Sequence, residues 1–137
     1  LRTARESTEK PWQQIADQCR GVVFLATPHS GSSLANILSL LSLGLKSVHI
    51  DKLKADSSEL TELNESFRAH CVKQPMTVVA YYEKFKTGKS VIVVDQKSAD
   101  PGISGVTPIP VDADHTAICT PQSRQSPVYV SLRFRLK

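Results

Sequence analysis

Cysteine, methionine and long apolar runs are all scarce in this 137-residue sequence. The three cysteines are an odd number without C-x-x-C spacing, which argues against a disulfide framework and against a zinc site. No apolar run reaches the roughly eighteen to twenty residues that a membrane span needs, and the first residues, Leu1–Glu6, do not form a signal peptide. We therefore expect an intracellular chain with no transmembrane segment and no structural metal.

A strong excess of charge is missing as well. The net charge is +4, and the tightest basic group consists of Lys84, Lys86 and Lys89. Nucleic-acid sites usually show a denser basic stripe interleaved with aromatic residues, and aromatic residues make up only 6% of this chain. We interpret the lysine group as a solvated loop between two strands, and we expect no nucleic-acid partner.

Helical patterns occur in three parts of the chain. Pro11 suits the first turn of a short helix, where its missing N–H is not needed. The apolar residues of Leu34–Leu45 recur at helical spacing. Asp56 or Ser57 can cap a further helix, which we expect to end near His70–Lys73, because Pro75 follows.

Three short apolar runs predict buried strands: Val22–Ala26, Met76–Tyr82 and Ser90–Val94. Residues 95–121 are rich in Asp, Pro and Gly without periodicity, so we expect a loop there. Helices alternating with buried strands predict an α/β fold with a mostly parallel sheet, flanking helices and one domain over residues 1–137. Three strands are few for such a sheet, and we expect the chain to be the C-terminal part of a domain whose first strands are absent.

The end of the chain carries two conflicting patterns. Apolar residues alternate with period two from Val128 to Leu136, which is typical of a strand. A layered α/β fold instead favours a helix after the last strand. We predict the helix.

Four histidines are candidates for acid–base chemistry. A lone histidine is more often structural or exposed, and we interpret His49 and His70 in that way. The pair His70-Cys71 does not start a tyrosine-phosphatase Cys-x5-Arg loop, since Thr77 stands where the arginine is required. His115 differs because it lies in a loop after the last predicted strand, from which a histidine can reach the carboxyl edge of the sheet as a general base.

The chain order of the triad in α/β-hydrolases is Ser, then Asp or Glu, then His. Asp95 directly follows the last predicted strand, and His115 lies twenty residues further along the chain. No G-x-S-x-G elbow for a nucleophile occurs in the sequence. The serines of Ser30–Ser33 lack the flanking glycines, and we interpret Ser32 or Ser33 as the cap of the helix that starts at Leu34.

Three segments resemble the SERAC-type (serine-active-site-containing) α/β-hydrolases, which are intracellular lipase- and esterase-like proteins. These segments are Gly21–Ala35 (GVVFLATPHSGSSLA), Ser58–Phe67 (SELTELNESF) and Val91–Pro121 (VIVVDQKSADPGISGVTPIPVDADHTAICTP). The family places its G-H-S-x-G-G elbow just before the position that corresponds to Leu1. The resemblance therefore implies a C-terminal fragment of one α/β-hydrolase domain, inactive by itself because the nucleophile is absent.

The resemblance also implies roles for particular residues. His115 occupies the Asp-His position of the motif and is expected to be the triad base, while His29 and Ser30 are expected to shape the pocket. The implied reaction is the hydrolysis of a carboxylic ester, with lipids or phospholipids as substrates. Acyl transfer by this route needs no cofactor. Association with mitochondria or the endoplasmic reticulum follows from the resemblance alone.

The acid position departs from the family pattern. The family has Glu or Asp immediately before Ser-Ala, and this chain has Lys97 there. Asp95 or Asp100 is therefore expected to serve as the acid. Lys97 also favours an alternative function, a non-catalytic hydrolase-like interaction module of a signalling or lipid-associated protein.

Overall fold

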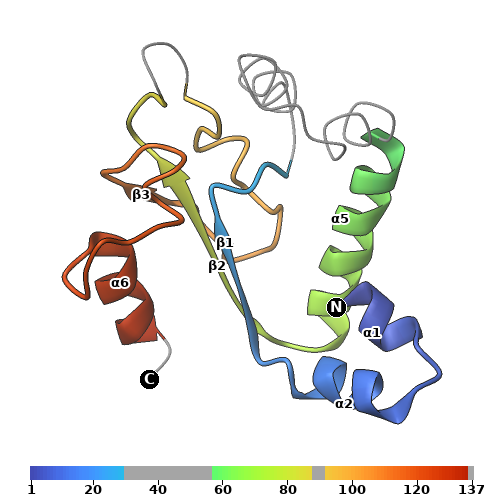
Figure 1. Cartoon of the computed structure of the whole chain (residues 1–137). Coiled ribbons are helices and arrows are strands. Elements are labelled where there is room, and N and C mark those ends of the chain that lie inside the picture. The colour runs from blue at the N-terminus through green and yellow to red at the C-terminus, as the bar shows by residue number, and fades with distance from the viewer. Residues whose placement is uncertain (30–56, 88–91, 136–137) are drawn as a thin grey trace, which may run out of the picture.

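The computed structural model of the protein describes residues 1–29, 57–87 and 92–135, and Figure 1 shows how its elements are arranged. In chain order the elements are α1 (Arg2–Glu6), α2 (Lys10–Gln18), β1 (Gly21–Leu25), α5 (Ser57–Lys73), β2 (Thr77–Glu83), β3 (Ile109–Val111) and α6 (Pro127–Arg135). The helices predicted around Pro11 and after Ser57 are confirmed. The helix predicted over Leu34–Leu45 lies outside the described residues.

The three strands form one parallel sheet in the order β1-β2-β3. Gly21 pairs with Thr77 at one end of the β1–β2 ladder, and Tyr81 pairs with Ile109 where β3 joins. Gly21 is needed at its position, because a Cβ atom there would lie 2.9 Å from the Thr77 carbonyl oxygen. The parallel α/β architecture predicted from the sequence is thus confirmed.

β3 does not come from Ile92–Val94, the described part of the predicted strand Ser90–Val94; Ser90 and Val91 lie outside the described residues. Val93 and Val94 are not in a strand; their backbone N–H groups donate to the Glu83 carboxylate at 2.5 and 2.8 Å. β3 forms instead within the segment expected to be a loop. Its central residue, Pro110, has no N–H to donate, and a strand that pairs on one side only can accommodate this.

The core lies between one face of the sheet and the segment that ends in α6. Tyr81 and Val79 of β2 pack in one cluster with Ile118 and with Val128 of α6. The Tyr81 hydroxyl hydrogen-bonds the Ser131 hydroxyl at 2.8 Å. The helix predicted at the end of the chain is therefore confirmed, because burial of Val128 against the sheet outweighs the period-two pattern.

The opposite face of β1 lies against α5. Phe24 of β1 meets Phe67 of α5 edge to face, with ring centroids 5.5 Å apart. The α5 residue Arg68 donates from Nε to the Pro101 carbonyl oxygen at 2.6 Å. α5 therefore covers β1 and also contacts the loop that leads toward β3, while α1 and α2 lie beside its C-terminal end (Figure 1).

Candidate active site

The side chains with catalytic potential gather at the carboxyl ends of the parallel strands, where ligand sites of such sheets usually lie. Glu83 is the last residue of β2, and His115 lies in the turn after β3. The two residues are 32 positions apart in the sequence, and the Nδ1 atom of His115 lies 3.1 Å from Oε2 of Glu83. This carboxylate–imidazole pair is the centre of the site.

The Glu83 side chain has no solvent exposure, whereas the His115 side chain is 35% exposed. A buried carboxylate is costly unless its oxygens are hydrogen-bonded. Oε1 of Glu83 accepts the N–H groups of Val93 and Val94, and Oε2 faces the His115 ring. The carboxylate is thus held in one orientation, with its partner imidazole at the surface.

The backbone around His115 is also constrained. The His115 N–H donates to the Thr87 hydroxyl at 2.9 Å. Oδ1 of Asp114 accepts the N–H groups of Thr116 and Ala117 at 3.0 and 2.8 Å, and the fully buried Ile118 anchors the end of the turn. These contacts fix the backbone from which the imidazole projects, and the ring itself contacts Glu83.

The pairing determines what the imidazole can do. When Nδ1 carries a proton and donates it to Glu83, the lone pair of Nε2 is free to accept a proton from another group. This is the arrangement that a general base needs in acyl transfer. A carboxylate on Nδ1 also stabilises the imidazolium that forms after the proton is accepted.

The two carboxylates expected from the sequence are engaged elsewhere. Oδ1 of Asp95 accepts the N–H and the hydroxyl of Ser98 at 2.8 and 2.7 Å, and these bonds lower the pKa of Asp95 below its usual value. Asp100 accepts the Gly102 N–H at 2.8 Å. The structure brings neither aspartate to the imidazole of His115, and it places Glu83 there instead.

Sequence reasoning missed Glu83 because the predicted strand stopped one residue earlier, at Tyr82. Glu83 was then grouped with the charged loop that follows. The available signal was its position as the first charged residue after a buried strand, where a carboxylate reaches the carboxyl edge of the sheet. Its burial, which distinguishes it from Asp95, depends on the amides of Val93 and Val94 and was not visible in the sequence.

Cys119 lies on the turn next to the pair. Its Sγ is 3.9 Å from the Leu25 carbonyl oxygen. Cys119 is an exposed residue, yet partial desolvation of its thiol raises the pKa, and the negative charge of Glu83 raises it further. A raised pKa keeps the thiol protonated at neutral pH, which disfavours Cys119 as a nucleophile for His115.

The loop after β1 carries His29. Its N–H donates to the Ser98 carbonyl oxygen at 2.7 Å, and its ring packs edge to face against Phe24 with a centroid separation of 4.4 Å. Burial lowers the pKa of His29, so the ring is neutral at pH 7. A pocket-shaping role for His29 remains a prediction, and Ser30 lies outside the described residues.

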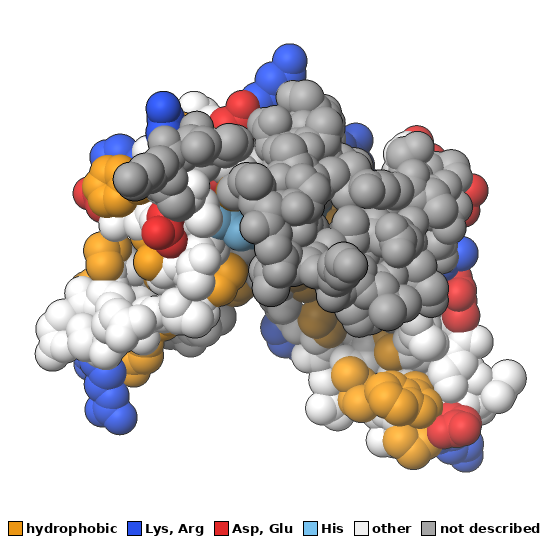
Figure 2. All heavy atoms as spheres, turned by 45° about the horizontal axis from the view of Figure 1, so that its top comes forward, with side chains coloured by type: hydrophobic (Ala, Val, Ile, Leu, Met, Phe, Trp, Pro, Cys, Tyr) orange, Lys and Arg blue, Asp and Glu red, His pale blue; other side chains and the backbone are white. Residues whose placement is uncertain are grey.

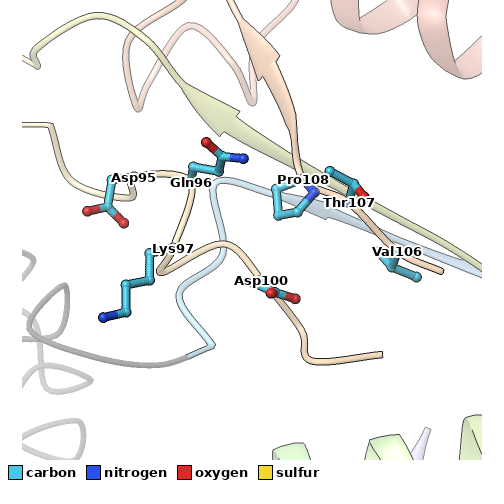
Figure 3. Close-up of a pocket in the computed structure, with 7 residues that line it drawn as sticks. All are labelled: Asp95, Gln96, Lys97, Asp100, Val106, Thr107 and Pro108. Carbon is cyan, nitrogen blue, oxygen red and sulfur yellow. The ribbon is translucent and has the colours of Figure 1, made fainter. Parts of the chain in front are cut away.

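An open pocket of about 520 Å³ lies beside this loop region. Figure 3 shows its lining, with Asp95, Gln96 and Lys97 on one stretch of chain and Val106–Pro108 on the segment before β3, while Asp100 lies between them. His115 and His29 do not line it. Both aspartates predicted as the acid therefore face this pocket.

Two further properties concern only the residues that the structure describes. Among them, no three His, Cys, Asp or Glu side chains are grouped so that they could hold a metal ion. None of the described helices is long and apolar enough to cross a membrane.

Comparison with known proteins gives one consistent relationship. The chain is 30% identical to the human protein SERAC1 over 128 residues and 31% identical to the mouse protein SERAC1 over 130 residues, in each case over 90% of this chain. The zebrafish (Danio rerio) protein SERAC1 is 31% identical over 80% of the chain. The chain spans about a fifth of the length of these relatives, from 17 to 20%.

No family model and no solved structure matches the chain. The relationship to SERAC-type proteins, predicted from the three sequence segments, is therefore confirmed by the curated proteins alone.

Proposed function

We propose that this relative of the SERAC1 proteins supplies the general base and its orienting carboxylate to a serine hydrolase, with His115 as the base and Glu83 as the carboxylate. The observation that carries the proposal is the 3.1 Å contact between Nδ1 of His115 and Oε2 of Glu83. The attacking serine belongs to a part of the parent protein outside these 137 residues, since the sequence has no G-x-S-x-G motif.

The reaction is the hydrolysis of a carboxylic ester in two steps. Nε2 of His115 accepts the serine proton as the serine oxygen attacks the ester carbonyl carbon, and the resulting imidazolium gives that proton to the departing alcohol. Water then attacks the acyl-serine as Nε2 accepts its proton, and the imidazolium returns that proton to the departing serine oxygen as the acid is released. Throughout, Glu83 holds the imidazole by Nδ1 and stabilises its charged form.

The fold supports the same assignment. The Glu83–His115 pair lies at the carboxyl ends of a parallel sheet, in the chain order acid and then base that α/β-hydrolases use. We therefore assign the chain to the C-terminal part of an α/β-hydrolase domain. Lipids and phospholipids as substrates, and a site of action near mitochondria or the endoplasmic reticulum, rest on the relationship to SERAC-type proteins.

The alternative is a hydrolase-like module that binds a partner without catalysis. In the sequence, Lys97 favoured this alternative, because it stands at the position where the family has an acidic residue. Glu83 removes this argument, since it supplies a carboxylate to His115 that does not depend on position 97. The catalytic proposal is therefore preferred.

The parent protein with its complete hydrolase domain provides the test, with a fluorophosphonate probe that labels an activated serine. We expect Glu83→Gln to slow labelling by roughly 10⁴-fold and His115→Ala by up to roughly 10⁶-fold, the scales seen when a triad carboxylate and a triad base are replaced. The measurement is the labelling rate of the folded protein, with folding checked by circular dichroism.

Asp95→Asn and Asp100→Asn are the matched controls, because each removes a carboxylate near the same sheet edge. We expect both to keep the wild-type labelling rate. A loss of labelling in Asp95→Asn with full labelling in Glu83→Gln would show that the acid has been assigned wrongly. A folded parent protein that does not label at all would support the interaction module.

A further inference from the structure

The outward face of α6 is unusually apolar for a surface helix. Val128 packs into the core, and Ser131 binds Tyr81, so these residues define the inner side of the helix. On the 3.6-residue repeat, Tyr129, Val130, Arg133 and Phe134 then form one continuous stripe on the other side. The exposed fractions of its three apolar members are 38%, 38% and 72%. A surface helix normally presents polar side chains there.

The charged residues of the chain segment that contains this stripe have a single sign. Residues 116–137 contain four of the 17 Lys and Arg residues, and none of the 13 Asp and Glu residues. The rest of the chain carries 13 residues of each sign, so the whole net charge of +4 resides in this terminal segment. Arg133 and Arg135 lie in the last turn of α6, and Arg124 lies just before the helix; all three are exposed.

The stripe is also well separated from the exposed apolar side chains of α2. In Figure 1, α6 lies across the sheet from α1 and α2. At the lower left of Figure 2, where α6 lies, hydrophobic and basic side chains are visible and acidic ones are not. Trp12 and Ile15 of α2 form a second exposed apolar group, which lies at the opposite end of the molecule.

We propose that the outward face of α6 docks the protein onto an anionic membrane surface. Aromatic and aliphatic side chains gain free energy by entering the boundary between headgroups and acyl chains, and arginines pair with anionic headgroups while their alkyl stems lie along the apolar layer. An acidic residue beside the stripe would be repelled by such a surface, and the segment has none. The stripe binds the lipid surface, whereas His115 acts on the ester bond of a substrate. The docking therefore does not depend on the proposed catalysis.

A membrane fits these observations better than a nucleic acid or a protein partner. A nucleic-acid site needs a denser row of cations than three described arginines. A protein interface is likewise enriched in aromatic residues and arginine, but all four charged residues of 116–137 are cationic, and this one-sided charge matches an extended anionic surface. The stripe offers only apolar side chains and arginines, which suits a fluid, negatively charged surface.

Co-sedimentation with lipid vesicles tests the proposal on the full chain. We expect binding to phosphatidylcholine vesicles that contain phosphatidylserine, little binding to pure phosphatidylcholine vesicles, and a loss of binding as salt is raised. Each arginine near the surface contributes roughly five-fold to the affinity, so Arg133→Gln combined with Arg135→Gln should weaken binding by about thirty-fold. Tyr129→Ser combined with Phe134→Ser should weaken it by at least about ten-fold.

Matched variants on α2 and at Arg20, just after it, provide the controls and are called the α2 variants. Trp12→Ser combined with Ile15→Ser removes exposed apolar side chains, and Lys10→Gln combined with Arg20→Gln removes two exposed cations; both pairs should leave vesicle binding unchanged. The salt dependence of the wild-type chain needs no variant and therefore remains decisive if a variant fails to fold.

Three results would overturn the proposal. The first is binding that does not distinguish phosphatidylserine vesicles from pure phosphatidylcholine vesicles. The second is binding that is lost in the α2 variants and kept in the α6 variants. The third is a dimer, detected by sedimentation velocity without lipid, that the Tyr129→Ser and Phe134→Ser pair abolishes, because the stripe would then be covered by a second copy.

Discussion

Glu83 illustrates how a single residue can serve both folding and chemistry. Its carboxylate accepts two backbone N–H groups from Val93 and Val94 and also faces the imidazole of His115. The first two bonds hold a segment that does not join the sheet, and the third positions the proposed base. Because the side chain is fully buried, neither role can be taken over by water.

Replacing Glu83 should therefore have graded effects on stability. Glu83→Gln keeps one oxygen that can accept the two amides, and it loses the charge-assisted part of these bonds, so we expect a loss of about 1–2 kcal/mol in the free energy of unfolding. Glu83→Leu leaves both amides without an acceptor and should cost about 3–5 kcal/mol. Urea unfolding measures both variants.

Asp95→Asn and Asp95→Leu give the matched comparison, since Asp95 is itself exposed and accepts from Ser98 in a partly buried bond. At position 95 we expect the Asn and Leu variants to have similar free energies of unfolding. At position 83 we expect the Gln and Leu variants to differ much more in this quantity. Equal costs for Glu83→Gln and Glu83→Leu would mean that the amides of Val93 and Val94 do not depend on this acceptor.

At the scale of elements, α6 is joined to the sheet by burial and by one defined polar contact. Val128 and the half-buried Leu132 pack against the core cluster, and the Tyr81 hydroxyl meets the Ser131 hydroxyl. Tyr81 is 1% exposed, so its hydroxyl has few alternatives to Ser131. α6 thereby covers the face of β2 opposite to the face that α5 approaches.

A double-mutant cycle measures this contact. We expect Tyr81→Phe and Ser131→Ala each to lower the free energy of unfolding by about 0.5–1.5 kcal/mol, because each leaves the other hydroxyl without its partner. The double variant should cost less than the sum of the two single variants, with a coupling energy of at least about 0.5 kcal/mol. Strictly additive costs would show that the two hydroxyls do not interact in solution.

Elements were predictable where their signal is local. Pro11 in the first turn of α2, the start of α5 at Ser57 and the apolar runs of β1 and β2 all depend on neighbouring residues in the chain. The sequence predicted Ser90–Val94 as the third strand, and the structure has Ile109–Val111 there instead. This difference was not predictable. It depends on a side chain in β2 that captures the amides of Val93 and Val94.

At the scale of the whole molecule, we expect stability to depend on pH through the buried His70 and the half-buried His29. His70 in α5 is 5% exposed, and its Nε2 has no hydrogen-bond partner among the described residues. Burial lowers the pKa of His70 from the ordinary value of 6.5, and the positive charge of Arg5 lowers it further. The folded state therefore resists protonation at this position more than the unfolded state does.

The sign of the pH effect follows from this difference. Between the lowered folded pKa and 6.5, the unfolded chain binds more protons, so stability falls as the pH drops below 6.5 and levels off beneath the folded pKa. His70→Leu should flatten this part of the stability profile and raise the stability at neutral pH by about 1 kcal/mol, because it removes an unsatisfied buried nitrogen.

The measurement is the free energy of unfolding across this pH range, in the wild-type chain and in the variant. His29 also has a lowered pKa through burial, and a remaining slope in His70→Leu should disappear when His29→Leu is added. An unchanged slope in His70→Leu would contradict the assignment of the pH dependence to this residue.

The sequence by itself determined the α/β class, the parallel β1 and β2 strands, the flanking helices and the relationship to SERAC-type proteins. It also indicated His115 as the base candidate, because motif and chain order are properties of the sequence. Only the tertiary structure decided which carboxylate meets His115 and which segment forms β3. Both depend on contacts between residues far apart in the chain, and burial of one carboxylate with its amide donors has no local sequence pattern.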